Sequence, residues 1–293
     1  LLLASMLADV KKDERFNCPA YTQAATANGG ILMGAEPDFC DVEPEAYTIN
    51  WEQVTHRVVF VASINGRTPA SYAEDIERHR AVGHFVIEDA AQALGSWHGD
   101  KHVGTMGDVG VFSFGAPKIV TTGQGGCVVT NDDAISERIH AIKNFGRTVG
   151  VGEVYNVMGM NFKFTDLQAA FGCEQMLRLP KVVERKKEIY TAYRRLLADV
   201  CEFVHTDITQ ATPTYPEILV DDRDALAQHL RNYSIGCRAV YDSLTNQPFH
   251  QRWATPTPVT DSIGSRGLQL PAQADLLDYD IVEICNDVKD FYK

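Results

Sequence analysis

Four polar residues between His84 and Asn131 could together perform chemistry with a bound cofactor. They are Asp89, Gln92, Ser113 and Lys118. A lysine held beside a buried carboxylate and a phosphate-binding Gly/Ser turn suits a Schiff base to pyridoxal phosphate. The carboxylate would keep the pyridine nitrogen of that cofactor protonated, so that the ring can accept electrons.

Each of these residues also has a simpler explanation. Asp89 could cap the amino end of a helix that begins at Ala90. Gln92 could be a solvated helix residue, Ser113 a turn residue and Lys118 one of many surface lysines. By spacing alone the simpler explanations are favoured, and both interpretations stay open.

Short apolar runs lie beside these residues in the sequence and predict the strands that position them. The runs are His84–Ile87, Val109–Phe114 and Cys127–Thr130. Short apolar runs bounded by glycines and acids are typical of strands in a sheet that is buried on both faces. Open α/β sheets bind ligands just beyond the carboxyl ends of their strands. We therefore expect the four polar residues to converge on one crevice.

The chain before residue 84 predicts the class of this sheet. Val58–Ile64 reads as a buried strand, and Ser71–Val82 reads as a helix with acids early and basic residues late, as the helix dipole prefers. Gly83 supplies the expected helix stop. A strand, a helix and a strand in this order predict an α/β fold with a mostly parallel sheet.

The second half of the chain predicts a change of architecture. Two helices are expected at Thr165–Met176 and Leu179–Val200, followed by short strands and helices. We therefore predict a large domain over residues 1–178, a connecting helix over 179–200 and a small α+β domain over 201–293.

Several long motifs resemble the DegT family of pyridoxal-phosphate-dependent sugar aminotransferases, which have the type I aminotransferase fold. The resemblance runs in order along nearly the whole chain, so it is far more specific than a lone Gly-rich loop. Its motifs are Glu88–Gly95, Gly104–Phe114, Lys118 with the following Thr-Thr-Gly-Gln-Gly-Gly, Lys143–Arg147, Asn161–Ala170 and Gly267–Pro271.

The resemblance implies a role for each site residue. Lys118 would form the Schiff base with pyridoxal phosphate and then act as acid and base. Asp89 would pair with the pyridine nitrogen, and Gln92 would bind the 3′-oxygen of the ring. Ser113 would bind the cofactor phosphate. Asn161 would reach the cofactor phosphate of the other subunit, so the resemblance implies a homodimer with a shared active site.

The resemblance also implies the substrates, namely L-glutamate as amino donor and a nucleotide-linked 4-keto-6-deoxy sugar as acceptor. The pattern is most similar to the perosamine synthase branch, which aminates C4 of GDP-4-keto-6-deoxymannose for polysaccharide biosynthesis. Arg238 with Tyr241 would face the substrate. A sugar 3-dehydratase is a competing hypothesis, although those members carry His where Lys118 stands. The chain could also be a catalytically silent or truncated homologue with a regulatory or structural role, or an amino-acid aminotransferase.

Two departures from the family pattern affect the cofactor site. Gln23 stands where the family usually places an aromatic residue over the cofactor ring, with Tyr21 nearby. The chain also starts just after the place of the family's Gly-Thr/Ser-Ala segment, which holds the cofactor phosphate at a helix N-terminus. An N-terminally truncated member of the family is therefore expected.

Composition limits the partners and the setting. The 293 residues carry a formal net charge of −12, which argues against nucleic acid as a main partner, although a local site could still bind a nucleotide-linked sugar. The seven cysteines are odd in number and form no Cys-x-x-Cys pair, which favours a reducing compartment. No apolar run approaches membrane-spanning length, so no membrane partner and a cytoplasmic location are expected. No histidine spacing indicates a metal site.

Overall fold

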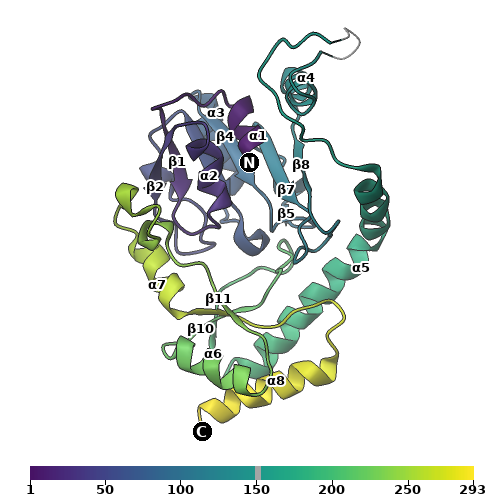
Figure 1. The fold of residues 1–293 in the computed structure, drawn as a ribbon. Coiled ribbons are helices and arrows are strands. Elements are labelled where there is room, and N and C mark those ends of the chain that lie inside the picture. The colour runs from purple at the N-terminus through teal and green to yellow at the C-terminus, as the bar shows by residue number, and fades with distance from the viewer. Residues whose placement is uncertain (149–152) are drawn as a thin grey trace.

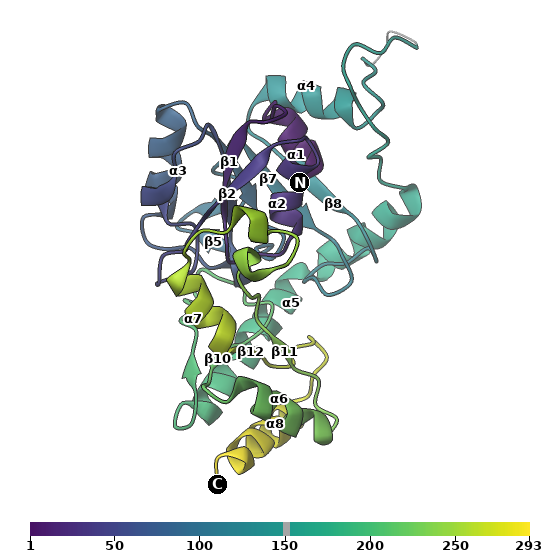
Figure 2. The same ribbon diagram turned by 60° about the vertical axis from the view of Figure 1, so that its left-hand side comes forward.

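Two β-sheets, joined by one long helix, make up the protein (Figures 1 and 2). The computed structural model describes residues 1–148 and 153–293. The first sheet has six strands in the order β2-β1-β3-β4-β7-β8. Its first five strands are parallel, and β8 runs antiparallel to β7. The predicted α/β class with a mostly parallel sheet is confirmed.

The elements of the first sheet follow the predicted order. Its strands are β1 (Arg15–Pro19), β2 (Glu36–Cys40), β3 (Val58–Ala62), β4 (Phe85–Asp89), β7 (Val109–Ser113) and β8 (Gly126–Val129). The helices beside it are α1 (Leu2–Leu7), α2 (Ala25–Ile31), α3 (Tyr72–Ala81) and α4 (Asp133–Ile142). Short pieces complete this part, namely the β5–β6 hairpin (Trp97–His98 with Lys101–His102) and the 3-10 turns η1 (Trp51–Gln53) and η2 (Ile64–Gly66).

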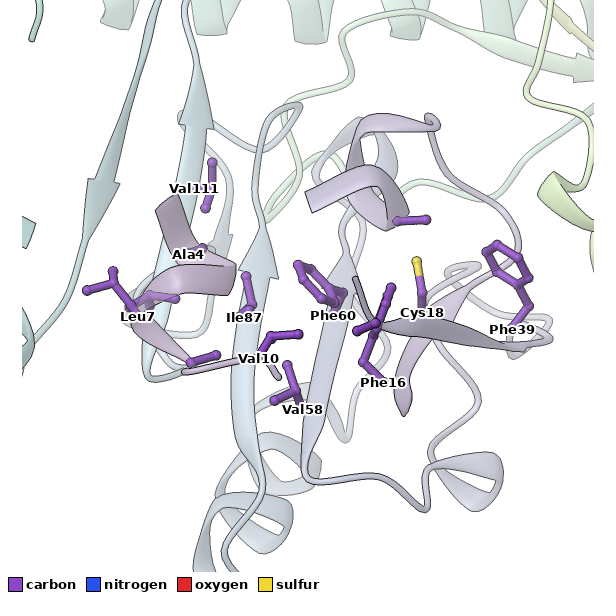
Figure 3. Packing of buried hydrophobic residues seen from close by; sticks show 14 of the residues in the cluster. Ala4, Leu7, Val10, Phe16, Cys18, Phe39, Val58, Phe60, Ile87 and Val111 are labelled. Carbon is purple, nitrogen blue, oxygen red and sulfur yellow. The ribbon is translucent and has the colours of Figure 1, made fainter. Parts of the chain in front are cut away.

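Strand β3 shows why this sheet needs cover on both faces. All five of its residues are buried, and successive side chains of a strand point to opposite faces. Val58 and Phe60 pack in the cluster under α1 and α2. The rings of Phe60 and Phe16 lie edge to face there, with their centres 5.3 Å apart (Figure 3). Val59 and Val61 pack in the cluster under α3. The apolar run therefore forms a central strand of a two-sided core.

A buried carboxylate at the end of β4 shapes the loop that leads into β7. Glu88 accepts hydrogen bonds from the backbone N–H groups of Gly104 (2.9 Å), Met106 (2.6 Å) and Gly107 (2.6 Å), and from the hydroxyl of Tyr72 (3.0 Å). A Cβ atom on Gly107 would lie 2.7 Å from a carbonyl oxygen of β4. The Gly-rich motif therefore packs closely around Glu88, and it places the neighbouring Asp89 at the end of the strand.

The second sheet is antiparallel and has a core of its own. Its order is β11-β12-β10-β9, with β9 (Glu202–Phe203), β10 (Glu217–Leu219), β11 (Arg238–Ala239) and β12 (Gly267–Gln269). The accompanying helices are α6 (Arg223–Asn232), α7 (Pro258–Arg266) and α8 (Asp278–Phe291), with the 3-10 turns η3 (Leu244–Asn246) and η4 (Gln251–Trp253). Ile218, Leu226 and Leu268 are fully buried here together with side chains of the connecting helix.

One continuous helix, α5 (Asp166–Leu197), replaces the two helices that the sequence predicted. Thr165 and Gln168 form a capping box at its start, as the spacing requires. The predicted break was wrong because the helix continues through Pro180, although a proline there removes one backbone hydrogen bond. Side chains of α5 pack into the core of the second sheet. The predicted domain boundaries at residues 178 and 201 stay a prediction.

Buried polar contacts join the two parts of the molecule. Arg67, after β3, pairs with Glu217 of β10 at 2.5 Å, and both side chains are almost fully buried. Asp41 accepts from the backbone N–H groups of Val259 and Thr260 in the first turn of α7, both at 2.9 Å.

Among the described residues, no helix combines the length and the apolar character that crossing a bilayer requires.

Candidate active site

A cavity of about 1200 Å³ opens at the carboxyl ends of the parallel strands. Asp89 is the last residue of β4 and Ser113 the last residue of β7, while Gln92 and Lys118 follow in the next turns. All four line this cavity, which brings the predicted residues together as expected. This is the edge where parallel α/β sheets bind ligands.

Asp89 is held by two hydrogen bonds on its two carboxylate oxygens. Its Oδ2 accepts from the Thr26 hydroxyl at 2.6 Å, and its Oδ1 accepts from the backbone N–H of Ala91 at 3.1 Å. The side chain is buried yet reaches the cavity wall. Its interpretation as a helix cap is wrong, because residues 91–95 contain turns and no helix.

Lys118 provides a half-buried amine in the same cavity. Burial lowers the pKa of this amine, the charge of Asp89 acts to raise it, and the charge of Arg238 lowers it further. A lowered pKa increases the neutral fraction of an amine, which is the form that attacks carbonyl carbon. Lys118 therefore has the environment of a reactive lysine rather than that of a surface lysine.

Gln92 is fixed between two parts of the chain. Its Nε2 donates to the Tyr241 hydroxyl at 3.0 Å, and its Oε1 accepts from the backbone N–H of Asn65 at 3.2 Å. The guanidinium of Arg238 lies 5.5 Å from the centre of the Tyr241 ring, and both residues line the cavity. The interpretation of Gln92 as a solvated helix residue is therefore wrong.

Ser113 lies in a part of the cavity where backbone atoms approach closely. Its Oγ accepts from the backbone N–H of Gly115 at 3.3 Å. The neighbouring Gly126 has no room for a side chain, since a Cβ atom would lie 2.4 Å from the carbonyl oxygen of Phe112. The Ser113 hydroxyl keeps its own hydrogen and can donate it to an anion in the cavity.

The other positions predicted to lie near the cofactor do not all line the cavity. Asn161 is exposed and does not line the cavity of its own chain; its Oδ1 accepts from the backbone N–H of Lys163 at 3.3 Å. Gln23 does line the cavity. Tyr21 is fully buried beside Tyr241, with ring centres 6.2 Å apart, and is not part of the lining.

The sequence reasoning missed a local excess of positive charge. Lys143 and Lys163 line the cavity together with Lys118 and Arg238, against one carboxylate, that of Asp89. The four cations come from separate segments, and the chain as a whole has a net charge of −12. A charge count along the sequence could not find this group, because only the fold brings it together.

The comparisons with known proteins identify the family. The model of the DegT/DnrJ/EryC1/StrS aminotransferase family matches residues 1–289. The chain belongs to this family. It is 31% identical to the GDP-perosamine synthase of Vibrio cholerae, covering 100% of this chain and 83% of the relative. The GDP-perosamine synthase of Escherichia coli O157:H7 is 28% identical, with 100% and 83% covered.

A solved structure confirms the predicted fold. A DegT DnrJ EryC1 StrS aminotransferase from Brucella abortus superposes with a TM-score of 0.92 at 25% identity, covering 99% of this chain and 83% of that one. The resemblance predicted from the motifs is therefore confirmed, and the enzyme is a pyridoxal-phosphate-dependent sugar aminotransferase.

The cavity fits the cofactor of this family. Its lining offers an amine for the aldehyde (Lys118), a carboxylate for the ring nitrogen (Asp89), an amide for the ring oxygen (Gln92) and a hydroxyl for the phosphate (Ser113). A lysine for the aldehyde and a carboxylate for the ring nitrogen are groups by which proteins hold pyridoxal phosphate. The residues that line the cavity therefore suit this cofactor.

Proposed function

We propose that the protein transfers the amino group of L-glutamate to C4 of GDP-4-keto-6-deoxymannose, or of a closely similar nucleotide-linked 4-keto-6-deoxy sugar. The observation that carries the proposal is the pairing of a buried, hydrogen-bonded carboxylate with an amine of lowered pKa in one cavity. Bound pyridoxal phosphate supplies an electron sink, which lets a C–H bond next to nitrogen break.

In this proposal Lys118 has two tasks. Its Nζ would hold the cofactor at rest through the aldehyde carbon, and once released it would carry a proton between the two carbon atoms that exchange the amino group. The lowered pKa favours both tasks, because the neutral amine is the form that attacks a carbonyl carbon and accepts a proton. A lysine at position 118 also argues against a 3-dehydratase, since the members with that activity carry His there.

The other cavity residues would hold and orient the cofactor. Asp89, fixed on both oxygens, would pair with the protonated ring nitrogen. Gln92 binds the ring oxygen with an amide that Asn65 and Tyr241 already orient. Ser113 binds the phosphate group.

The charge of the cavity supports a substrate with a diphosphate. Lys143, Lys163 and Arg238 remain available to phosphate oxygens once Lys118 holds the cofactor. Clustered cations attract anionic substrates into a cleft even when the protein as a whole is acidic. The names of the two perosamine synthases support the GDP-linked keto sugar as that anion.

We further propose a homodimer in which Asn161 completes the partner's site. The start of α5 lies at the edge of the molecule, beyond β8 (Figures 1 and 2). Large apolar side chains in this region are exposed, among them Met158 (76%), Leu167 (87%) and Leu177 (76%). Large apolar side chains that are exposed in one region of a protein are typical of an interface. A cytoplasmic location is also part of the proposal, because the seven cysteines are free thiols.

The deciding experiment is a visible absorbance spectrum of the protein with added pyridoxal phosphate, before and after L-glutamate. The proposal expects a band from the lysine-bound cofactor that glutamate bleaches, after which keto-sugar nucleotides can be screened as acceptors. Lys118→Ala should lack the band and should lose at least a thousandfold of its turnover, since the covalent attachment and the proton carrier both disappear. A Lys118→Ala protein that still turns over would contradict the proposal, and absence of the band in the natural protein would favour a catalytically silent homologue.

A further inference from the structure

Two buried threonines form a chain of hydrogen bonds that ends on Asp89. Thr22 lies before α2 and Thr26 lies in its first turn, and their hydroxyl oxygens are 2.8 Å apart. Thr26 is fully buried and Thr22 is 2% exposed. The Thr26 hydroxyl is 2.6 Å from Asp89 Oδ2. Neither threonine has a part in the chemistry described above.

The direction of this chain follows from the number of hydrogens. An ionised carboxylate only accepts, so the single hydroxyl hydrogen of Thr26 goes to Asp89. Thr26 must then accept from Thr22, which donates. A distance of 2.6 Å is typical of a hydroxyl that donates to a charged oxygen. A hydroxyl that itself accepts a hydrogen bond is polarised and donates more strongly.

The chain leaves part of the carboxylate free for the cavity. Oδ2 accepts from Thr26, and Oδ1 accepts from the backbone N–H of Ala91. Each carboxylate oxygen can accept two hydrogen bonds, so each keeps one place for a donor from the cavity side. The two existing bonds fix the plane of the carboxylate, because they hold its two oxygens from different segments.

We propose that the Thr22–Thr26 pair is a positioning device that orients the Asp89 carboxylate toward the cavity. This inference rests on the proposed function, since it assigns the oriented carboxylate to the ring nitrogen of pyridoxal phosphate. Thr26 acts directly on the carboxylate, and Thr22 acts through Thr26. Both are positioning residues rather than catalytic residues.

The test uses Thr26→Val, which keeps the shape of the side chain and removes the hydroxyl, and Thr26→Ser, which keeps the hydroxyl. The measurement is the affinity for pyridoxal phosphate, from absorbance titrations between pH 5.5 and 8.5. Loss of a hydrogen bond to a charged group should weaken binding about tenfold or more. The loss should appear throughout this pH range, because it follows from the lost orientation of the carboxylate. Thr26→Ser should bind within about twofold of the natural protein.

A control separates this effect from general destabilisation. Thr206 is 4% exposed, lies in the second part of the chain and donates to the carbonyl of Val204. Thr206→Val should reduce thermal stability without changing cofactor affinity or its pH profile. In an Asp89→Asn background, Thr26→Val should have little further effect on affinity, because its target is gone.

The outcomes separate this inference from the proposed function. If the natural protein binds the cofactor and Thr26→Val binds it equally well at every pH, the inference is overturned and the proposed function stands. If the natural protein shows no cofactor band, the proposed function fails first. Equal losses in Thr26→Val and Thr26→Ser would assign a packing role to Thr26 and would also overturn the inference.

Discussion

Asp89 and Lys118 are held in opposite ways. Asp89 is fixed at both oxygens, whereas Lys118 makes no side-chain hydrogen bond to the described part of the chain. A group that pairs with a stationary ring nitrogen benefits from being fixed. A group that binds the cofactor and later moves a proton must travel by a few ångströms. The different restraints of the two side chains therefore match the two roles proposed for them.

A pair of histidines gives the protein a pH dependence away from the cavity. His79 Nδ1 and His84 Nδ1 lie 2.9 Å apart, and the His79 ring lies 4.5 Å from the Trp51 ring. Burial lowers the pKa of both, and the neighbouring charge of His84 lowers that of His79 further. Because both folded values lie below the ordinary value near 6.5, the unfolded chain binds more protons as the pH falls.

The expected result is a free energy of unfolding that is fully retained above about pH 6.5 and decreases below it. His84→Gln should make the curve between pH 7 and pH 5 flatter, since one of the two protonations then disappears and the other meets no second charge. Urea unfolding at half-unit pH steps measures this. An unchanged slope in His84→Gln would show that the pair carries no pH dependence.

Residue types near a strand end were predictable, but their partners were not. Asp89, Gln92, Ser113 and Lys118 follow apolar runs, so a sheet with ordinary connections places them at one edge. Thr26 lies 63 residues from Asp89 in the sequence, and neither a period nor a motif links the two. Side-chain contacts between residues so far apart in the sequence depend on how α2 packs against the sheet. That packing does not follow from the residue patterns of a single sequence.

At the scale of elements, both strands and helices were predicted closely where the residue pattern is regular. The predicted strand Val58–Ile64 ends two residues earlier, at Ala62, because Ile64 begins the 3-10 turn η2. The predicted helix Ser71–Val82 is observed as Tyr72–Ala81. The predicted break at residues 177–178 was wrong, because α5 continues through it and through Pro180, which local propensity disfavours in a helix.

The loop of residues 104–107 around the Glu88 carboxylate (the Glu88 turn) predicts a loss of stability when Glu88 is substituted. Glu88→Gln would replace one accepting oxygen by an NH₂ group. The amide can keep its oxygen toward Met106 and Gly107, but its NH₂ group then faces the backbone N–H of Gly104. A buried donor without an acceptor costs about 1–3 kcal/mol, so the free energy of unfolding should fall by about that amount. Urea unfolding at neutral pH measures the difference. Glu77→Gln, an exposed change on the neighbouring α3, is the matched control and should stay within about 0.5 kcal/mol.

A loss below about 0.5 kcal/mol in Glu88→Gln would contradict the role of this carboxylate in the turn. A larger loss accompanied by normal cofactor affinity in the remaining folded protein would show that the turn supports the fold alone.

At the scale of the whole molecule, the exposed apolar surface predicts the oligomeric state. Leu167, at the start of α5, is 87% exposed among other exposed apolar side chains. If this surface forms the dimer, Leu167→Asp buries a charge in the interface and should shift the protein to monomers. Analytical ultracentrifugation measures the mass in solution. Leu32→Asp, at a residue 70% exposed after α2, is the control and should leave the dimer intact.

A Leu167→Asp protein that remains dimeric would exclude this surface as the main interface. If it becomes monomeric and also binds the cofactor more weakly, the result would agree with a phosphate contact from Asn161 of the other subunit.

The Glu88 turn has a consequence for the way such enzymes are found in genomes. The motif residues Glu88, Gly104 and Gly107 serve the architecture of a loop, whereas Lys118 and Asp89 serve the proposed chemistry. A homologue without catalytic activity would still need this turn in order to fold. A search guided by the Gly-rich motif therefore finds proteins with this fold, and we expect the lysine–aspartate pair to mark the aminotransferases among them.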